Sequence, residues 1–106
     1  MEHINRVELQ GRIGTLRLQD IVGTKVATFS LCTQMSVNVG SVPLVETTWH
    51  TITALEGCGE PLDFLSKGDL VKVVGRIKQS KYTDASGMER MFTEVVASEL
   101  TLMEAI

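Results

Sequence analysis

The stretch that most constrains the fold runs from residue 47 to residue 55, with the sequence Thr-Thr-Trp-His-Thr-Ile-Thr-Ala-Leu. Residues of this β-branched and aromatic kind suit a pleated, half-buried surface, so we expect a β-strand. Successive side chains of a strand point to opposite faces, which puts Trp49 and Leu55 on one face and His50 and Ile52 on the other. We expect the His50 face to point inward and the Trp49 face to be open to a partner.

Four further stretches alternate between apolar and polar residues and are predicted as strands. They are residues 6–13 with a kinked continuation over 16–18, then 25–33, 69–82 and 91–103. Residues 34–46 have no helical period and contain Gly40 and Pro43, so they form either a long hairpin loop or strand ends that extend past the body. The expected inward positions are Val7, Leu9, Gly11, Ile13, Ala27, Phe29, Leu31, Val71, Val73, Gly75 and Ile77, with Lys72, Val74, Arg76, Lys78 and Tyr82 facing out.

One segment, residues 57–68, is a candidate for a short helix. Pro61 suits a first helical turn, Gly68 suits the position after the last turn, and Lys67 suits the negative end of the helix dipole. Three strands, a short helix and two more strands is the order found in a five-stranded OB-fold barrel, although periodicity alone also admits other small barrels. We therefore predict an all-β domain over residues 1–106 with one short helix between its third and fourth strands.

Length and cysteine content bound the class of protein. A chain of 106 residues suits one domain, and it has no run of about 18 apolar residues that could cross a membrane. The first five residues lack the pattern of a signal peptide, so we expect a cytoplasmic protein with Cys32 and Cys58 reduced. The sequence contains no nucleophile elbow, phosphate-binding loop or Cys-x-x-Cys pair, so we expect neither enzyme activity nor a metal or cofactor.

Positive charge is unevenly distributed. The net charge of −3 argues mildly against a strong nucleic-acid binder, and residues 26–66 contain no Lys or Arg. Residues 67–81 carry five cations against Asp69 alone, and a phosphate backbone responds to such a local stripe. The stripe is either a solvated strand edge that discourages aggregation or part of a groove that tracks a single strand. Its cations are Lys67, Lys72, Arg76, Lys78 and Lys81.

Several motifs in this order resemble bacterial single-stranded-DNA-binding proteins of the OB-fold type. Residues 4–14 are similar to the family's first strand, residues 26–31 to its second, and residues 46–50 to its Thr-Glu-Trp-His motif. Residues 64–77 follow its Tyr-Leu-x-Lys-Gly segment and the strand after it, and residues 82–87 and 93–97 complete the match. The resemblance implies non-sequence-specific binding of single-stranded DNA in replication, recombination or repair, either chromosomal or associated with a mobile element.

The resemblance also implies roles for individual residues. Trp49 and Tyr82 are expected to stack on bases, although Trp49 could be a half-exposed barrel residue and Tyr82 could pack on the neighbouring strand. His50 matches a histidine at a subunit contact, which implies a homotetramer, or a dimer as the alternative; as a residue alone it is as easily a satisfied interior histidine. The expected phosphate contacts are Arg6, Arg12, Lys67, Lys78 and Lys81, with Lys72 and Arg76 added by the basic stripe.

This chain departs from the family pattern at several positions. Val37 and Leu55 stand near positions where the family has aromatic rings, and Thr51 replaces an arginine. The loss of two stacking residues costs on the order of 2–6 kcal/mol of binding free energy. The sequence stops at Ile106, and we expect the family's flexible linker and acidic tip to be absent. The alternative function is therefore a protein-assembly module similar to primosomal replication protein N, with weak DNA binding and replication or conjugation proteins as partners.

Overall fold

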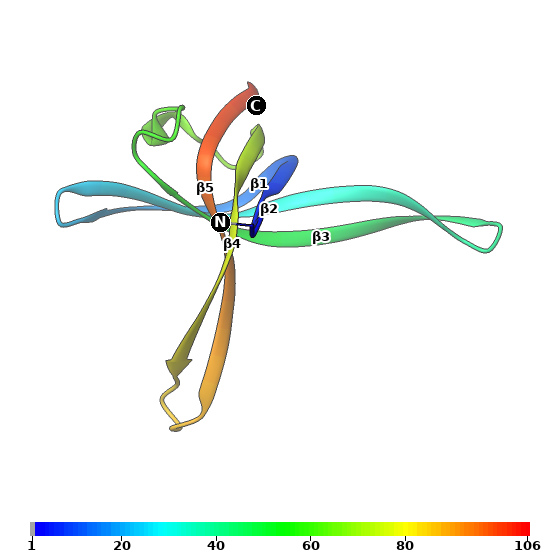
Figure 1. Ribbon diagram of the computed structural model, residues 1–106. Helices are drawn as coiled ribbons and strands as arrows, with labels where there is room; N and C mark the ends of the chain where they lie inside the picture. Colours follow the sequence, from blue (N-terminus) through cyan, green and yellow to red (C-terminus); the bar gives the residue numbers. More distant parts are fainter. Residues whose placement is uncertain (1) are drawn as a thin grey trace.

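The computed structural model describes residues 2–106, and five long strands with one helical turn make up the fold (Figure 1). The elements are β1 (Val7–Ile21), β2 (Thr24–Val39), β3 (Val42–Leu55), the 3-10 turn η1 (Leu62–Phe64), β4 (Leu70–Thr83) and β5 (Glu89–Glu104). The strands close into a barrel in the order β1-β2-β3-β5-β4, in which only the β3–β5 contact is parallel within residues 2–106. This confirms the predicted five-stranded OB-fold barrel. No helix in this part of the chain is long and apolar enough to cross a membrane.

The core lies inside the barrel, and alternation along the strands produces it. Phe29, Leu31, Ile52, Val71 and Val73 are all 2% exposed or less. Each is an inward position of its strand, so the apolar side chains of β2, β3 and β4 meet without any polar neighbour between them. The faces predicted for residues 6–13, 27–31 and 50–54 are confirmed.

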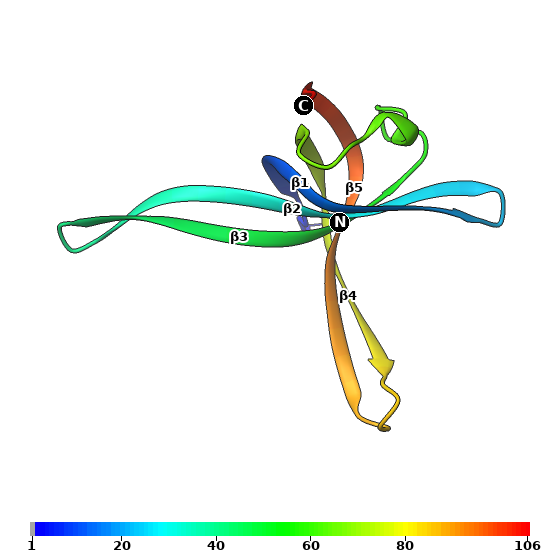
Figure 2. The same cartoon turned by 180° about the vertical axis from the view of Figure 1, so that it is seen from behind.

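Three hairpins, β1–β2, β2–β3 and β4–β5, extend beyond the barrel as two-stranded ribbons (Figures 1 and 2), and the second and third of these are the arms considered below. β2 and β3 remain paired up to Val39 and Val42, although β1 accompanies β2 only as far as Cys32 within the described residues. We call residues 33–48 the β2–β3 arm. β4 and β5 likewise remain paired up to Thr83 and Glu89, and we call residues 76–94 the β4–β5 arm. Of the two interpretations of residues 34–46, strand ends that extend past the body is therefore correct.

The segment predicted as a helix, residues 57–68, is mostly irregular. Gly57, Gly59 and Gly68 have φ angles of 92°, 128° and 94°, which a right-handed helix cannot contain. Only the turn η1 follows Pro61, and it is anchored by the buried side chains of Leu62 and Leu65. The prediction of a short helix is thus wrong in extent and type, while its place between the third and fourth strands is right.

Two positions in β4 have the opposite exposure to the predicted one. Val74 is 7% exposed because the chain's first residues, including Asn5 and Arg6, lie beside it. Ile77 is 48% exposed because it already belongs to the arm, past the last pairing between β1 and β4 at Gly75. The register between β4 and β5 also shifts between Val74 and Gly75. Alternation therefore predicts burial only where the strand has a core to face.

Candidate nucleic-acid interface

The outer face of β1, β2 and β3 forms an open surface that we call the platform. Cross-strand pairing places Trp49 beside Cys32, and Cys32 beside Arg12. One row further along, Thr51 lies beside Ser30, and the next row joins Thr53, Thr28 and Arg17. The platform residues are Arg12, Arg17, Thr28, Ser30, Cys32, Trp49, Thr51 and Thr53, all half-buried or exposed.

Trp49 is the single large ring of the platform, and its position depends on a glycine. The indole lies so close to Gly14 that a Cβ atom built there would be 2.5 Å from Cζ3 and 3.0 Å from Cη2. The β1 backbone therefore supports part of the ring, while 60% of the residue is exposed. Glycine within a strand commonly permits a close approach, and here the ring of Trp49 is what approaches Gly14. This contact leaves a broad aromatic surface free to stack on a base.

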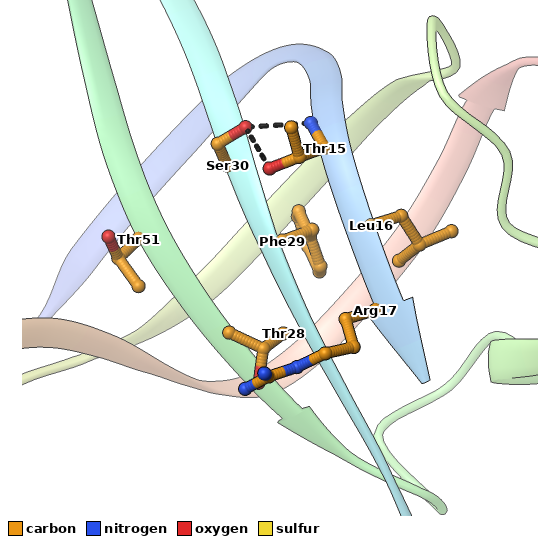
Figure 3. A pocket seen from close by; sticks show the side chains of 7 residues that line it. All are labelled: Thr15, Leu16, Arg17, Thr28, Phe29, Ser30 and Thr51. Carbon is orange, nitrogen blue, oxygen red and sulfur yellow. Dashed lines mark hydrogen bonds between the residues drawn. The ribbon is translucent and has the colours of Figure 1, made fainter. Parts of the chain in front are cut away.

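The strand beneath the ring is bent by a bulge, which a serine from the neighbouring strand stabilises. The register of β1 against β2 shifts between Ile13 and Leu16. The Oγ atom of Ser30 accepts a hydrogen bond from the backbone N–H of Thr15 at 2.8 Å and lies 3.0 Å from its Oγ1, as the dashed lines in Figure 3 show. A bulge bends and twists its strand. The bend lies next to Gly14 and so shapes the surface on which Trp49 rests.

Arg17 is a candidate site residue that the sequence interpretation missed. It belongs to a hollow of about 310 Å³ on the platform, and its side chain extends across β2 toward Thr28 (Figure 3). No acidic side chain forms an ion pair with it within residues 2–106, so its charge is available to a phosphate. The signal was present, since Arg17 alternates with Leu16 and Leu18, but only the pairing of β1 with β2 shows that it shares a face with Trp49.

Four of the predicted phosphate contacts already have acidic neighbours. All these pairs lie at the surface, where water weakens their attraction and a phosphate can compete for the cation. The hydrogen bond from Lys72 lowers the pKa of Glu8 below its ordinary value, so Glu8 stays charged at neutral pH. The pairs are Arg6–Glu8 at 3.8 Å, Arg12–Glu104 at 3.5 Å, Lys72–Glu8 at 3.0 Å and Lys81–Glu89 at 3.4 Å.

Three of the other predicted residues lie on the β4–β5 arm, and Lys67 lies in the loop before β4. Arg76, Lys78 and Tyr82 share one face of the β4–β5 arm. Within residues 2–106 neither cation forms an ion pair, although Glu94 lies directly opposite Lys78 on β5. Tyr82 is 52% exposed near the tip of this arm, far from Trp49 at the base of the other arm (Figure 1). Lys67 lies in the loop that follows η1. The predicted residues thus form a platform group and an arm group rather than one cluster.

His50 lies on the inner face of β3, where it is half-buried. One of its ring nitrogens, Nε2, lies 2.8 Å from Oγ1 of Thr33, so this nitrogen has a hydrogen-bond partner within the chain. The ring also lines a hollow of about 390 Å³ whose apolar wall includes Val7, Ile77 and Val95. This position at the edge of the core agrees with an interior histidine, and the predicted subunit contact stays a prediction.

A family model matches residues 4–103, and its description is the single-strand binding protein family. The chain belongs to this family. Among the family's curated members, a single-stranded DNA-binding protein from Neisseria meningitidis is 35% identical over 105 residues, which cover 94% of this chain and 60% of the relative. A second, from Bacteroides thetaiotaomicron, is 32% identical over 94% of this chain and 66% of the relative. The chain thus spans about two thirds or less of the length of these relatives.

The fold also matches a solved structure of the family. A structure described as a Plasmodium falciparum SSB complex with ssDNA superposes with a TM-score of 0.84 and 26% sequence identity. The match covers 100% of this chain and 98% of that chain, so the long arms are included. A member from Xylella fastidiosa, named single-stranded DNA-binding protein 1, is 30% identical over 97% of this chain and 79% of its own length.

Of the three positions where the resemblance predicts a departure from the family pattern, two lie on the outward face of β3 and one lies on the opposite face of the β2–β3 arm. Thr51 lies on the platform and Leu55 at the end of β3, where Leu55 is 48% exposed. Val37 lies on the β2–β3 arm, opposite Leu44. Trp49 is consequently the one aromatic ring among the outward residues of β3, and the rest of the platform is polar or small.

Proposed function

We propose that this protein binds single-stranded DNA without strong sequence preference and performs no catalysis. The observation that carries the proposal is the exposed indole of Trp49, supported by Gly14 on the open face of three strands, in a member of the single-strand binding protein family. Aromatic stacking suits this task because every base has a π-face, and each stacked base contributes about 1–3 kcal/mol. The names of the curated relatives and the description of the similar structure support the same ligand.

The remaining residues of the proposed site hold the phosphates. Arg17 lies on the platform within reach of a strand stacked on Trp49, and Arg12 lies on the same face. Lys72, Arg76 and Lys78 continue the positive charge along β4. Exposed ion pairs such as Lys72–Glu8 would exchange their acid for a phosphate. The proposed nucleic-acid-binding residues are Trp49, Tyr82, Arg6, Arg12, Arg17, Lys67, Lys72, Arg76, Lys78 and Lys81.

We further propose a homo-oligomer, a homotetramer or a dimer, that acts in replication, recombination or repair. The resemblance places His50 at a subunit contact, and it is at this residue that we expect subunits to meet. Cys32 and Cys58 are both free thiols, which supports a reducing compartment such as the cytoplasm. Size-exclusion chromatography with light scattering gives the number of subunits, and a purely monomeric protein would contradict the proposed assembly.

The direct test is titration of the intrinsic fluorescence of Trp49 with oligo-dT at low salt. We expect quenching as bases stack on the indole, and an affinity that falls as salt rises because phosphate contacts release counterions. Each lost contact should reduce the slope of log K against log salt by about 0.7. A double-stranded oligonucleotide is the matched competitor and should compete poorly. The absence of quenching at low salt, together with unchanged anisotropy of a labelled oligo-dT, would contradict the proposal.

One observation favours a second candidate, a protein-assembly module. The β2–β3 arm presents an apolar row of Met35, Val37, Val39, Val42 and Leu44 on the face opposite to its polar one, and four of these are at least 47% exposed. An exposed apolar strip of this kind is typical of protein contacts. Capture of a helicase or relaxase on the immobilised protein, with a flat DNA titration, would select this candidate over DNA binding.

A further inference from the structure

The β4–β5 arm carries a second exposed ring that the sequence interpretation did not identify. Phe92 is 40% exposed, and β-sheet pairing places it directly opposite Ser80, while Tyr82 lies opposite Arg90. Because Ser80 and Tyr82 are two residues apart on one strand, Phe92 and Tyr82 project from the same face of the arm. They are diagonal neighbours, at a separation that aromatic side chains can bridge.

Neither ring contributes to the core of the barrel. The core cluster and the side chains packed against it include neither Tyr82 nor Phe92. Both rings lie beyond Gly75, where β4 loses its partner β1, so no third strand covers them. The arm therefore leaves 52% of Tyr82 and 40% of Phe92 exposed to water, and a partner that covers this surface gains hydrophobic free energy.

The charges on the two faces of the arm indicate what covers the rings. The ring face carries Arg76, Lys78 and Arg90, with Glu94 directly opposite Lys78. Within residues 2–106 neither Arg76 nor Lys78 forms an ion pair with an acidic side chain. Arg90 forms an ion pair with Asp84 at the tip. The opposite face has no ring, and its one cation, Lys81, is paired with Glu89. Rings interleaved with free cations on one face fit a polyanion that has aromatic groups of its own.

We propose that Tyr82 and Phe92 form a second stacking subsite, which takes neighbouring bases of a single strand while Lys78 and Arg76 contact its phosphates. This inference rests on the proposed function and extends it to a ring that nothing else assigns to binding. The subsite supplies rings to a protein whose platform retains only Trp49. A strand that runs from the platform onto β4 would meet the unpaired cations before it reaches the two rings.

The first test removes the ring of Phe92 and keeps its bulk. Phe92→Leu should weaken binding to oligo-dT roughly tenfold to a hundredfold, the loss expected for one stacked base. Binding to an abasic oligonucleotide of the same length should not change, because its phosphates remain and its bases are gone. The matched control is Met91→Leu, which changes a neighbouring exposed residue on the opposite face of the arm and should leave both affinities unchanged.

The second test asks whether a ring at position 92 touches the bases. Phe92→Trp combined with Trp49→Phe moves the only indole onto the arm, and we expect oligo-dT to quench its fluorescence while the abasic oligonucleotide does not. A Phe92→Leu variant with a lower melting temperature and the oligo-dT affinity of the wild type would show that the two rings only stabilise the arm, and this result would overturn the subsite.

The outcomes separate this inference from the proposed function. If the wild type binds oligo-dT with quenching of Trp49, while Phe92→Leu binds equally tightly and an indole at position 92 is not quenched, the proposed function stands and the subsite is wrong. A wild-type protein that binds no single-stranded DNA rejects both.

Discussion

The two arms have the same architecture and opposite chemistry. Each is a two-stranded antiparallel ribbon that leaves the barrel and ends in a tight turn (Figure 2). The β2–β3 arm has no Lys or Arg and a single acid, Glu46, whereas the β4–β5 arm carries four cations, three acids and two rings. Both ribbons would be marginally stable alone, so both depend on the barrel at their base. The shared backbone architecture thus only extends the reach of the barrel, and the side chains determine what each arm can contact.

Removal of one arm at a time should give the largest difference in affinity for oligo-dT, because only the β4–β5 arm is expected to contribute to binding. Residues 80–92 can be replaced by Asn-Gly between Gln79 and Thr93, which are cross-strand partners. Loss of both rings should cost about 2–6 kcal/mol of binding free energy to oligo-dT. Replacement of residues 34–47 by Asn-Gly between the partners Thr33 and Thr48 should change that affinity little. Anisotropy of labelled oligo-dT measures both, and equal losses would break the contrast between the arms.

A smaller effect on binding is expected from substitution of Gly14, which lies under the ring of Trp49 at the base of the β2–β3 arm. Gly14→Ala places a Cβ atom 2.5 Å from Cζ3 of Trp49 and 2.6 Å from Oγ of Ser30, so both the indole and the Ser30 side chain must move. We expect a shift of the Trp49 emission maximum and a loss of about 1–2 kcal/mol of binding free energy, within the value of one stacked base. The control is the same substitution in a Trp49→Leu background, where it should weaken binding no further. An additive loss in that background would mean that Gly14 acts on the barrel rather than on the ring.

The difference in charge between the two arms can be reduced by adding lysines to the β2–β3 arm. Gln34 and Ser36 lie on the polar face of the β2–β3 arm, the face that continues from Trp49. Gln34→Lys combined with Ser36→Lys should tighten binding several-fold at low salt and steepen the salt dependence by about 1.4, or 0.7 for each new phosphate contact. Met35→Lys combined with Val37→Lys puts the same charge on the opposite face. An equal gain from this control pair would show that the strand does not follow the polar face.

The smallest effect concerns the tips of the arms under acid. Asp84 accepts hydrogen bonds from Arg90, Ser86 and the backbone N–H of Met88, and Arg90 is the main cause that lowers the pKa of Asp84 to about 2. Because the pKa of Asp84 is lower in the folded tip than in the unfolded chain, the ionised carboxylate stabilises the tip at pH values above the ordinary pKa of about 4. This stabilisation is lost as the pH falls toward 2.

Amide hydrogen exchange can detect this loss. Protection of Ser86 and Met88 should decrease between about pH 4 and pH 2, relative to the intrinsic exchange rates. The tip at Gly40 and Ser41 has no ionisable side chain and should show no such change. Asp84→Asn should remove the pH dependence at the β4–β5 tip, and a profile unchanged by this substitution would assign the transition to another group.

The barrel could be predicted from the sequence because its strands alternate wherever they face the core. Val71 and Val73 are buried as predicted, whereas Val74 and Ile77 are not placed correctly. The reason is non-local: the chain's first residues cover Val74, and the barrel ends before Ile77. The supposed helix over residues 57–68 failed for a local reason, since its glycines adopt positive φ angles that its apolar spacing does not reveal.

The candidate site was predicted less completely, because strand register decides which residues meet. Trp49 and Tyr82 are as exposed as expected, but the contact with Gly14 requires the indole of Trp49 on β3 to reach across β2 to the backbone of β1. Arg17 and Phe92 were missed because their partners, Thr28 and Ser80, are known only once the strands are paired. The acidic partners of Arg6, Arg12, Lys72 and Lys81 likewise depend on the folded arrangement.

The buried carboxylate of Asp69 fixes the position of Ile106, and this makes position 106 a suitable point for attaching a probe. Asp69 is 2% exposed, and its two carboxylate oxygens accept hydrogen bonds from the backbone N–H groups of Ser66 at 2.9 Å and Ile106 at 3.1 Å. The side chain of Ile106 rests on Gly68, so residue 106 is held beside the loop that follows η1. In Figure 1 this point lies at the opposite end of the barrel from the tip of the β4–β5 arm. A dye or surface tether joined after Ile106 would therefore begin from a fixed position and leave both arms uncovered.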